Sequence, residues 1–173
     1  MPLAMIPYTT DRLRLREAHP TDAPFILALL NSPGWLEHIG DRQVGDLKAA
    51  AAYVENALQK SYREHGYGLY LVERRSDGQS LGICGLVKRA HLEFPDLGFA
   101  ILPEYESRGY TTEAARATLH LARHHWAIPV VLGITTEVNQ RSQDLLLRLG
   151  LRRLALVQLG REPAEPLLLF GGS

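Results

Sequence analysis

The stretch PEYESRGYTTEA, residues 103–114, combines a chain-breaking proline and glycine with short polar side chains, and a helix-forming run follows it. A loop that ends at a helix N-terminus presents unpaired backbone N–H groups at the positive end of the helix dipole, where phosphate groups bind well. Gly109 lets the backbone approach a ligand closely and permits positive φ, while Arg108 adds a cation. The stretch therefore indicates either a phosphate-binding loop or an ordinary helix start with a turn glycine and capping threonines.

Composition and length restrict the class of protein that carries this loop. The chain has 173 residues, 46% of them hydrophobic and 22% charged, which favours one globular domain over residues 1–173. Lys plus Arg and Asp plus Glu are 19 each, so the net charge of zero argues against a protein that coats nucleic acid or an anionic membrane. We recognise neither a signal peptide nor an apolar run of about 20 residues, and we expect a cytoplasmic protein.

Hydrophobic periodicity predicts a mixed α/β sheet that would position the loop. Strands are expected at residues 12–17, 67–75, 80–90, 92–102, 128–137, 151–159 and 164–170, with helices within 19–34, 46–66, 111–126 and 139–150. Strands joined by short turns pair antiparallel, whereas the central strand–helix–strand unit favours a parallel or splayed crossover. The loop at 103–114 thus lies between a central strand and the long helix at 111–126.

Local signals add detail to these elements. In the first helix, Thr21 and Asp22 are candidate caps. The second helix places a row of side chains on one face and has Asp46 as its candidate N-cap and Gly66 as its stop, the row being Leu47, Ala51, Val54, Leu58 and Tyr62. The pair Asp77-Gly78 is the favoured type I′ hairpin dipeptide, and Pro95 marks an edge or an irregularity in its strand.

The order of these elements, with the loop before the long helix, resembles the GNAT superfamily of acetyl-CoA-dependent N-acetyltransferases. RGYTTEA is similar to the GYATEA motif that is common in one branch of this superfamily, the ribosomal-protein N-terminal acetyltransferases of the RimJ/RimL type. Four further stretches are similar to motifs of that branch: TDRLRLRE, NSP…IGD, DLGFAILPEY and NQRSQDLLLRLGL. They occur in the same order as in the branch, so the resemblance extends over nearly the whole chain. The resemblance implies a GNAT-like fold, with a mostly antiparallel sheet of about six to seven strands, a splayed parallel pair and about four flanking helices.

The resemblance also implies acetyl-CoA as the cosubstrate, with its pantetheine arm between the splayed strands and no metal ion. The cofactor-binding residues carried over are Phe99, Ala100, Ile101, Glu106, Arg108, Gly109, Tyr110, Thr111, Thr112 and Asn139. The family pattern at the loop is Gln/Arg-x-x-Gly-x-Gly/Ala, and Glu106, Gly109 and Thr111 fall on its three defined positions. Only the glycine matches, and both departures are of a kind that lowers the affinity for CoA.

Direct acetyl transfer to an amine needs a base, because a protonated amine has no lone pair. Asp96, just before the Gly-Phe pair, falls where the related branch often carries Glu and is the candidate base. Glu93 is the alternative if the register slips, and a carboxylate that supports a bulge after Pro95 is the structural alternative. Ser142 is the candidate that donates a hydrogen bond to the departing thiolate, or else only a helix-start hydroxyl, and a strand amide would polarise the acetyl carbonyl oxygen.

The expected partner is an amine acceptor, either a peptide N-terminus or a small molecule, with no nucleic-acid or membrane partner; a monomer and a homodimer both fit. A catalytically weak CoA-binding sensor and an interaction domain without cofactor binding are the alternatives, and Glu106 and Thr111 favour the sensor. His120 and His124 stand at a spacing that allows shared metal ligation, but no third ligand is evident. Cys84 lies in an apolar strand and is predicted to be a core residue.

Overall fold

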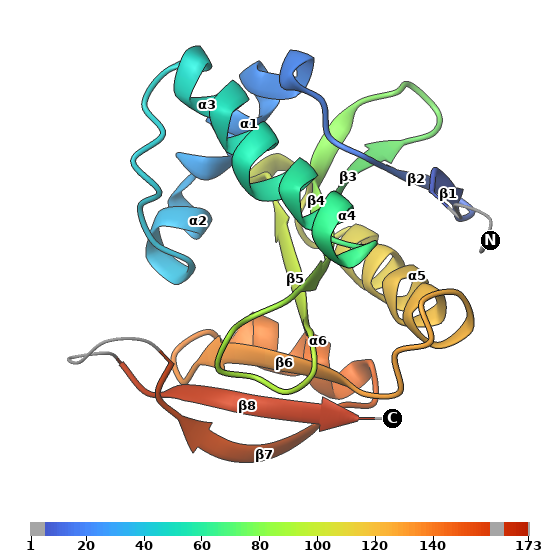
Figure 1. The fold of residues 1–173 in the computed structure, drawn as a ribbon, viewed down its shortest axis with the longest axis vertical. Helices are drawn as coiled ribbons and strands as arrows, with labels where there is room; N and C mark the ends of the chain where they lie inside the picture. Colours follow the sequence, from blue (N-terminus) through green and yellow to red (C-terminus); the bar gives the residue numbers. More distant parts are fainter. Residues whose placement is uncertain (1–5, 160–164, 173) are drawn as a thin grey trace.

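The computed structural model describes residues 6–159 and 165–172. Within these residues, eight strands form one sheet in the order β1-β2-β3-β4-β5-β6-β8-β7 (Figure 1). Neighbouring strands are antiparallel except β5 and β6, which are parallel. The strands are β1 Tyr8–Thr9, β2 Leu13–Arg16, β3 Leu69–Arg74, β4 Ser80–Val87, β5 Asp96–Ile101, β6 Val131–Thr136, β7 Arg152–Val157 and β8 Leu167–Gly172. The predicted mixed α/β class with its parallel pair is confirmed, and the short β1 is the strand that the sequence pattern missed.

The parallel pair is where the sheet divides. β5 and β6 are in register at a single position, Asp96 with Leu132, beside a hydrogen bond from the Leu132 amide to the Pro95 carbonyl. Beyond it β5 continues along β4, while β6 continues along β8. Figure 1 shows the result, in which β6, β8 and β7 run across the lower end of the molecule and β5 runs away from them. The sheet therefore opens into a gap between β5 and β6.

Helices cover both faces of this sheet and fix where the gap can be reached. The helical segments are η1 Pro20–Asp22, α1 Ala23–Leu30, α2 Pro33–His38, α3 Leu47–Tyr53, the π-helical η2 Val54–Gln59, α4 Lys60–His65, η3 Pro103–Tyr105, α5 Tyr110–His124 and α6 Gln140–Arg148. One core cluster joins α5 and α6 to the sheet through residues such as Ala115, Leu146 and Phe170. The other joins α1 and α3 to Ile83 on the opposite face. None of the helices in the described part of the chain combines the length and the apolar character needed to cross a membrane.

The helix predicted over 46–66 differs from the expectation in its interior. Asp46 caps it as predicted, accepting a hydrogen bond from the Ala49 amide at 2.7 Å, and Gly66 ends it with φ +76°. Its middle turns are the π-helical segment η2, and Leu47 is 52% exposed. Val54 and Leu58 of the predicted row are buried, and Ala51 and Tyr62 pack against the core, whereas Ala50 rather than Leu47 is the buried residue of the first turn.

Other local predictions have mixed outcomes. The Asp77-Gly78 turn is not type I′, because only Gly78 has positive φ and its amide bonds the Arg74 carbonyl four residues back. Of the two alternatives for Pro95, the irregularity is observed and the sheet edge is not, since β5 is an interior strand that starts directly after it. The first helix ends at Leu30, and a short second helix, α2, begins at Pro33.

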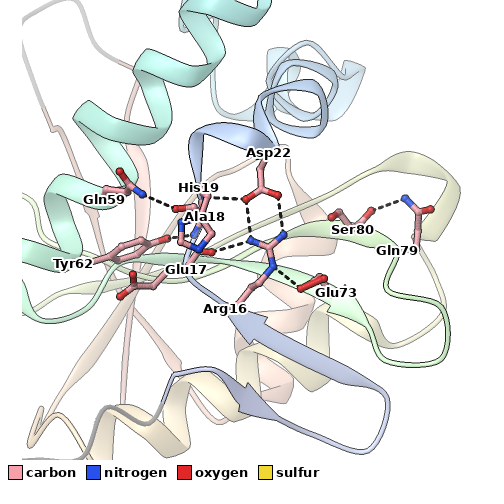
Figure 2. A network of polar contacts seen from close by, with 10 residues as sticks. All are labelled: Arg16, Glu17, Ala18, His19, Asp22, Gln59, Tyr62, Glu73, Gln79 and Ser80. Atoms are coloured by element: carbon pink, nitrogen blue, oxygen red, sulfur yellow. Dashed lines mark hydrogen bonds and ion pairs between the residues drawn. The ribbon is translucent and has the colours of Figure 1, made fainter.

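Asp22 also departs from its predicted role, because its carboxylate does not cap α1. It accepts hydrogen bonds from both terminal nitrogens of Arg16, at 2.8 and 2.7 Å, and from the His19 amide at 2.8 Å (Figure 2). Arg16 Nε donates to Glu73 on β3 at 2.5 Å. The nearby Tyr62 hydroxyl accepts from the Ala18 amide, so the network ties the chain between β2 and α1 to both the sheet and α4.

Asp22→Asn is expected to lower the free energy of unfolding by about 1–2 kcal/mol at pH 7, because it weakens a charge-assisted pair that keeps some solvent screening. Burial raises the pKa of the Asp22 carboxyl, but the hydrogen bonds from Arg16 and the His19 amide outweigh it, so the pKa lies below its ordinary value. The stabilisation is therefore present above the unfolded pKa of about 3.9 and is lost as the pH falls through the lowered folded pKa. Urea unfolding of both proteins over this pH range checks the prediction.

Asp77→Asn is the matched control for this experiment. Asp77 is also paired with an arginine, Arg74, at 2.6 Å, but the pair lies on the exposed hairpin. Exposed ion pairs contribute little to stability, so its loss should leave the urea midpoint almost unchanged. Equal effects of the two substitutions would contradict the structural role assigned to the Arg16 network.

Candidate active site

A cavity of about 1270 Å³ occupies the gap between β5 and β6. Its walls come from β5, the loop before α5, the end of β6 and the start of α6, and from α2 and the α3–α4 region on the other side. The strand β5 faces it with its backbone. The Pro95 carbonyl points toward β6, and backbone groups alternate along a strand, so the N–H and C=O groups of Leu97 and Phe99 point the same way. The Leu97 N–H belongs to the bridge between Asp96 and Leu132, so the Leu97 carbonyl and both backbone groups of Phe99 are the ones available to a ligand that lies along β5.

The loop 103–114 forms one end of the cavity. Gly109 is the N-cap residue of α5 with φ +80°, and no side chain caps the helix. Ser107 also has positive φ, at +61°. Thr111 and Thr112 lie in the first turn and line the cavity. The first amides of α5 are therefore not occupied by a cap, and they lie at the cavity wall, as the phosphate-loop interpretation requires.

An anchor for this loop was not identified in the sequence. Glu113, in the first turn of α5, accepts hydrogen bonds from the Thr10 hydroxyl at 2.6 Å and from Arg12 Nε at 2.7 Å. Arg12 Nη1 donates to the Arg108 carbonyl at 3.0 Å, and its guanidinium lies 4.5 Å from the centre of the Tyr110 ring. The turn between β1 and β2 thus fixes the loop from behind, through contacts between residues about a hundred positions apart that no local motif encodes.

The structure brings nearly all predicted cofactor residues to the cavity. Those on its wall are Phe99, Ala100, Ile101, Glu106, Gly109, Tyr110, Thr111, Thr112 and Asn139. Arg108 is the exception: it is not among the lining residues, and its carbonyl is bonded to Arg12. The cation that the sequence placed in the loop is therefore not a cavity wall residue.

Asn139 and Ser142 come together at the start of α6. The Asn139 side-chain oxygen accepts a hydrogen bond from the Ser142 amide at 3.2 Å, so Asn139 is the N-cap of α6. Ser142 is 9% exposed, and both residues line the cavity. The cap fixes where α6 begins, so Ser142, in the first turn of this helix, is held at the cavity wall.

Asp96 is the first residue of β5 and is 1% exposed, yet it lines the cavity. Its carboxylate accepts a hydrogen bond from Arg89 Nε at 2.8 Å. Burial raises the pKa of the Asp96 carboxyl, and the positive charge and hydrogen bond of Arg89 oppose this without reversing it. Glu93 is exposed and is not a lining residue, so of the two candidate carboxylates Asp96 is the one at the site.

Two polar atoms on the cavity wall residues have no hydrogen-bond partner. Among the buried side-chain atoms of the described residues, these are Trp35 Nε1 and Thr136 Oγ1. Both residues line the cavity, Trp35 from α2 and Thr136 from the end of β6. Buried polar groups are normally paired, and these two unpaired atoms belong to residues of the cavity wall.

The cysteine and the histidine pair considered in the sequence analysis do not line the cavity. Cys84 is 1% exposed, as predicted for a core residue, and burial raises the pKa of its thiol to about 12. The imidazole rings of His120 and His124 approach to 4.5 Å on α5. Within residues 6–159 and 165–172, no group of three His, Cys, Asp or Glu side chains is arranged to hold a metal ion.

A sequence model of the acetyltransferase (GNAT) domain family matches residues 12–152, a span that includes the loop, both splayed strands and α6. The chain belongs to this family. The family membership confirms the enzyme class predicted from the sequence, an acetyltransferase.

Individual relatives of this GNAT protein agree with its fold. It is 29% identical over 113 residues to the uncharacterized protein YkkB of Bacillus subtilis strain 168, and the match spans 64% of each chain. An acetyltransferase from Agrobacterium tumefaciens strain C58 superposes with a TM-score of 0.77 at 22% identity, covering 95% of this chain and 92% of that one. The ribosomal L7/L12 α-N-protein acetyltransferase RimL, in complex with coenzyme A, superposes with a TM-score of 0.78 at 15% identity, covering 94% of each chain. The GNAT fold, shared with a ribosomal-protein acetyltransferase, is the one predicted.

Proposed function

We propose that this protein transfers the acetyl group of acetyl-CoA to a primary amine, on a protein N-terminus or on a small molecule, by direct base-assisted attack. The observation that carries the proposal is the single-residue contact of β5 with β6 at Asp96 and Leu132 and the cavity that opens beyond it. A narrow acyl-carrying arm fits between two strands whose facing backbone groups are unpaired. The RimL structure with coenzyme A, although only 15% identical, has the same fold.

The chain's own groups fit acetyl-CoA at both ends of this gap. The amides from Arg108 to Thr112, at the uncapped start of α5, are donors for a pyrophosphate, and Gly109 permits the positive φ of the turn that presents them. The backbone carbonyls of Leu97 and Phe99 would hold the pantetheine arm as a neighbouring strand would. When bound, acetyl-CoA supplies an activated thioester carbonyl.

Asp96 is the proposed base. Its position where the strands separate supports the proposal that it faces the acetyl-carrying end of the ligand. The amine of an acceptor, with an ordinary pKa near 8 to 10, must lose a proton to become nucleophilic, and the raised pKa of Asp96 suits it to take that proton directly or through water. Arg89 holds the carboxylate at 2.8 Å and so orients it.

Ser142 and a β5 amide would complete the reaction. The amide of Phe99 faces the gap and is placed to donate to the acetyl carbonyl oxygen as negative charge develops there. The Ser142 hydroxyl, held by the cap of α6, would donate a hydrogen bond to the departing thiolate sulfur. A serine hydroxyl is a weak acid, so its contribution is to orient and stabilise the sulfur rather than to release a free proton.

A pair of measurements tests this function. Acetyl-CoA at a hundredfold excess over its Kd is expected to raise the free energy of unfolding by about 2.7 kcal/mol, seen as a higher Tm. A thiol-release assay over N-terminal peptides and small primary amines should then detect CoA production with at least one acceptor. An unchanged Tm would contradict cofactor binding altogether, whereas a raised Tm with thiol release at background for every acceptor would favour the CoA-binding sensor.

A further inference from the structure

We infer that Arg141 of α6 is the cation that binds the pyrophosphate of CoA, and that Glu106 holds it in place and competes with the ligand for it. The inference rests on the proposed function and names the residue that supplies the charge missing from the loop. It goes beyond the family's loop pattern, because Arg141 belongs to a different element. It also assigns a role to Glu106, the residue that departs most from that pattern.

The contacts of Arg141 place its guanidinium against the loop. Nη1 donates to Glu106 Oε2 at 2.6 Å, and Nη2 lies 3.3 Å from the Ser107 hydroxyl. All three residues line the cavity, and the side chain of Arg141 is 64% exposed while that of Glu106 is 32% exposed. The guanidinium therefore spans from α6 to the loop at the mouth of the gap and keeps solvent-facing donors.

The charges around the loop explain why such a cation is needed. The carboxylate of Glu106 stands directly before the amides proposed to bind phosphate, and an unpaired carboxylate there would repel a pyrophosphate. Arg108, the cation within the loop, is not a lining residue. Two other charged residues of α6, Asp144 and Arg148, line the cavity further along the helix; Asp144 accepts from Gln140, and Arg148 has no described contact with the loop.

A purely structural latch between α6 and the loop is the competing interpretation of the same ion pair. The two interpretations predict opposite signs for Glu106→Gln. If the pair only holds the loop in place, loss of either partner weakens CoA binding. If Arg141 binds the phosphate, Glu106→Gln frees the guanidinium and removes a repulsive charge, so CoA binding tightens while Arg141→Ala weakens it.

The experiment measures the Kd of CoA and of dephospho-CoA by titration calorimetry for the native protein, both single variants and the double variant. Arg141→Ala is expected to weaken both ligands by about tenfold or more, the effect of losing a charge-assisted hydrogen bond. Glu106→Gln is expected to tighten both, by about threefold or more, since one unit charge is removed close to the phosphates. In the double variant, Glu106→Gln should tighten binding less, because no guanidinium remains to be freed.

Arg116→Ala is the matched control, because Arg116 is exposed on α5, is not a cavity residue and carries the same charge. Its Kd should equal that of the native protein, which separates a local contact from a change in net charge. Three results would overturn the inference: an unchanged Kd for Arg141→Ala, a weaker Kd for Glu106→Gln, or an effect of Arg141→Ala on CoA that disappears with dephospho-CoA, since the contact would then be with the 3′-phosphate. Failure of the native protein to bind CoA would instead contradict the proposed function.

Discussion

Gly109→Val is expected to abolish CoA binding, with the Kd raised by at least about a hundredfold. Gly109 has φ +80°, a conformation that a β-branched residue resists, so the turn that presents the first amides of α5 would be displaced. A Cβ at this position would also lie 3.3 Å from Arg12 Nη2, the guanidinium that holds the loop from behind. Several phosphate donors would be lost together, so the loss of CoA affinity should be larger than that caused by removing any single side chain.

Calorimetric titration with CoA measures the effect, and circular dichroism shows whether the variant remains folded. Gly78→Val is the matched control, because Gly78 has a similar φ of +71° with open space around it, in a hairpin away from the cavity. Both variants should lose some stability from the strained backbone, but only Gly109→Val should lose CoA. Native affinity in a folded Gly109→Val protein would remove the loop from the cofactor site.

Much of the fold could be predicted because its elements have strong local patterns. The strand β4 is a continuous apolar run, and α5 and α6 have clear faces and ends, so their types follow from periodicity. The parts that were missed have no such pattern. β1 is only two residues long, and the π turn of η2 interrupts a helix whose sequence pattern is continuous. Pro95 stands directly before β5, so its missing N–H takes no hydrogen bond from the β4–β5 ladder, while its carbonyl accepts from the Leu132 amide.

Some residues of the candidate site could likewise be predicted from local patterns, and others could not. Gly109, Asn139 and Ser142 stand at helix starts, where residue type and position already indicate a role, and the structure places all three at the cavity. The arginines that pair with the two carboxylates of the site could not be predicted. Arg89 bonds Asp96 and Arg141 bonds Glu106 and Ser107, and a surface arginine has no sequence pattern that distinguishes a partner from a solvated charge. Such pairs become visible only when the fold brings both ends together.

Asp96→Asn is expected to lower the kcat of acetyl transfer by about 10²- to 10⁴-fold, the usual contribution of a general base, while the Kd of CoA stays unchanged. The asparagine side chain has nearly the same shape but cannot take a proton from the acceptor amine. Single-turnover measurement of thiol release, beside calorimetric titration with CoA, separates the two quantities. Asp77→Asn is the control, since it removes a carboxylate from an equivalent arginine pair outside the cavity and should leave both values unchanged.

The pH dependence makes this prediction specific to a base. Asp96 must be ionised to accept a proton, so kcat/KM of the native protein should fall as the pH drops through the pKa of Asp96, which burial raises above its ordinary value. Removing the opposing charge by Arg89→Gln should raise this pKa further. The acid limb of the pH profile, which is the fall of kcat/KM at low pH, should then shift to higher pH. The residual activity of Asp96→Asn should lack the limb. A merely structural carboxylate would lower activity at every pH and leave the limb in place, and that outcome would exclude Asp96 as the base.

The same raised pKa has a consequence for stability that an independent measurement can follow. The folded protein holds the proton on Asp96 more tightly than the unfolded chain does, so this group stabilises the fold most at acid pH, and that contribution decreases as the pH rises through the folded pKa. Asp96→Asn should therefore flatten the pH dependence of the urea midpoint in the range where the acid limb of kcat/KM lies. Agreement between the two ranges would tie the limb to Asp96 itself, because the unfolding transition requires no acceptor and no cofactor.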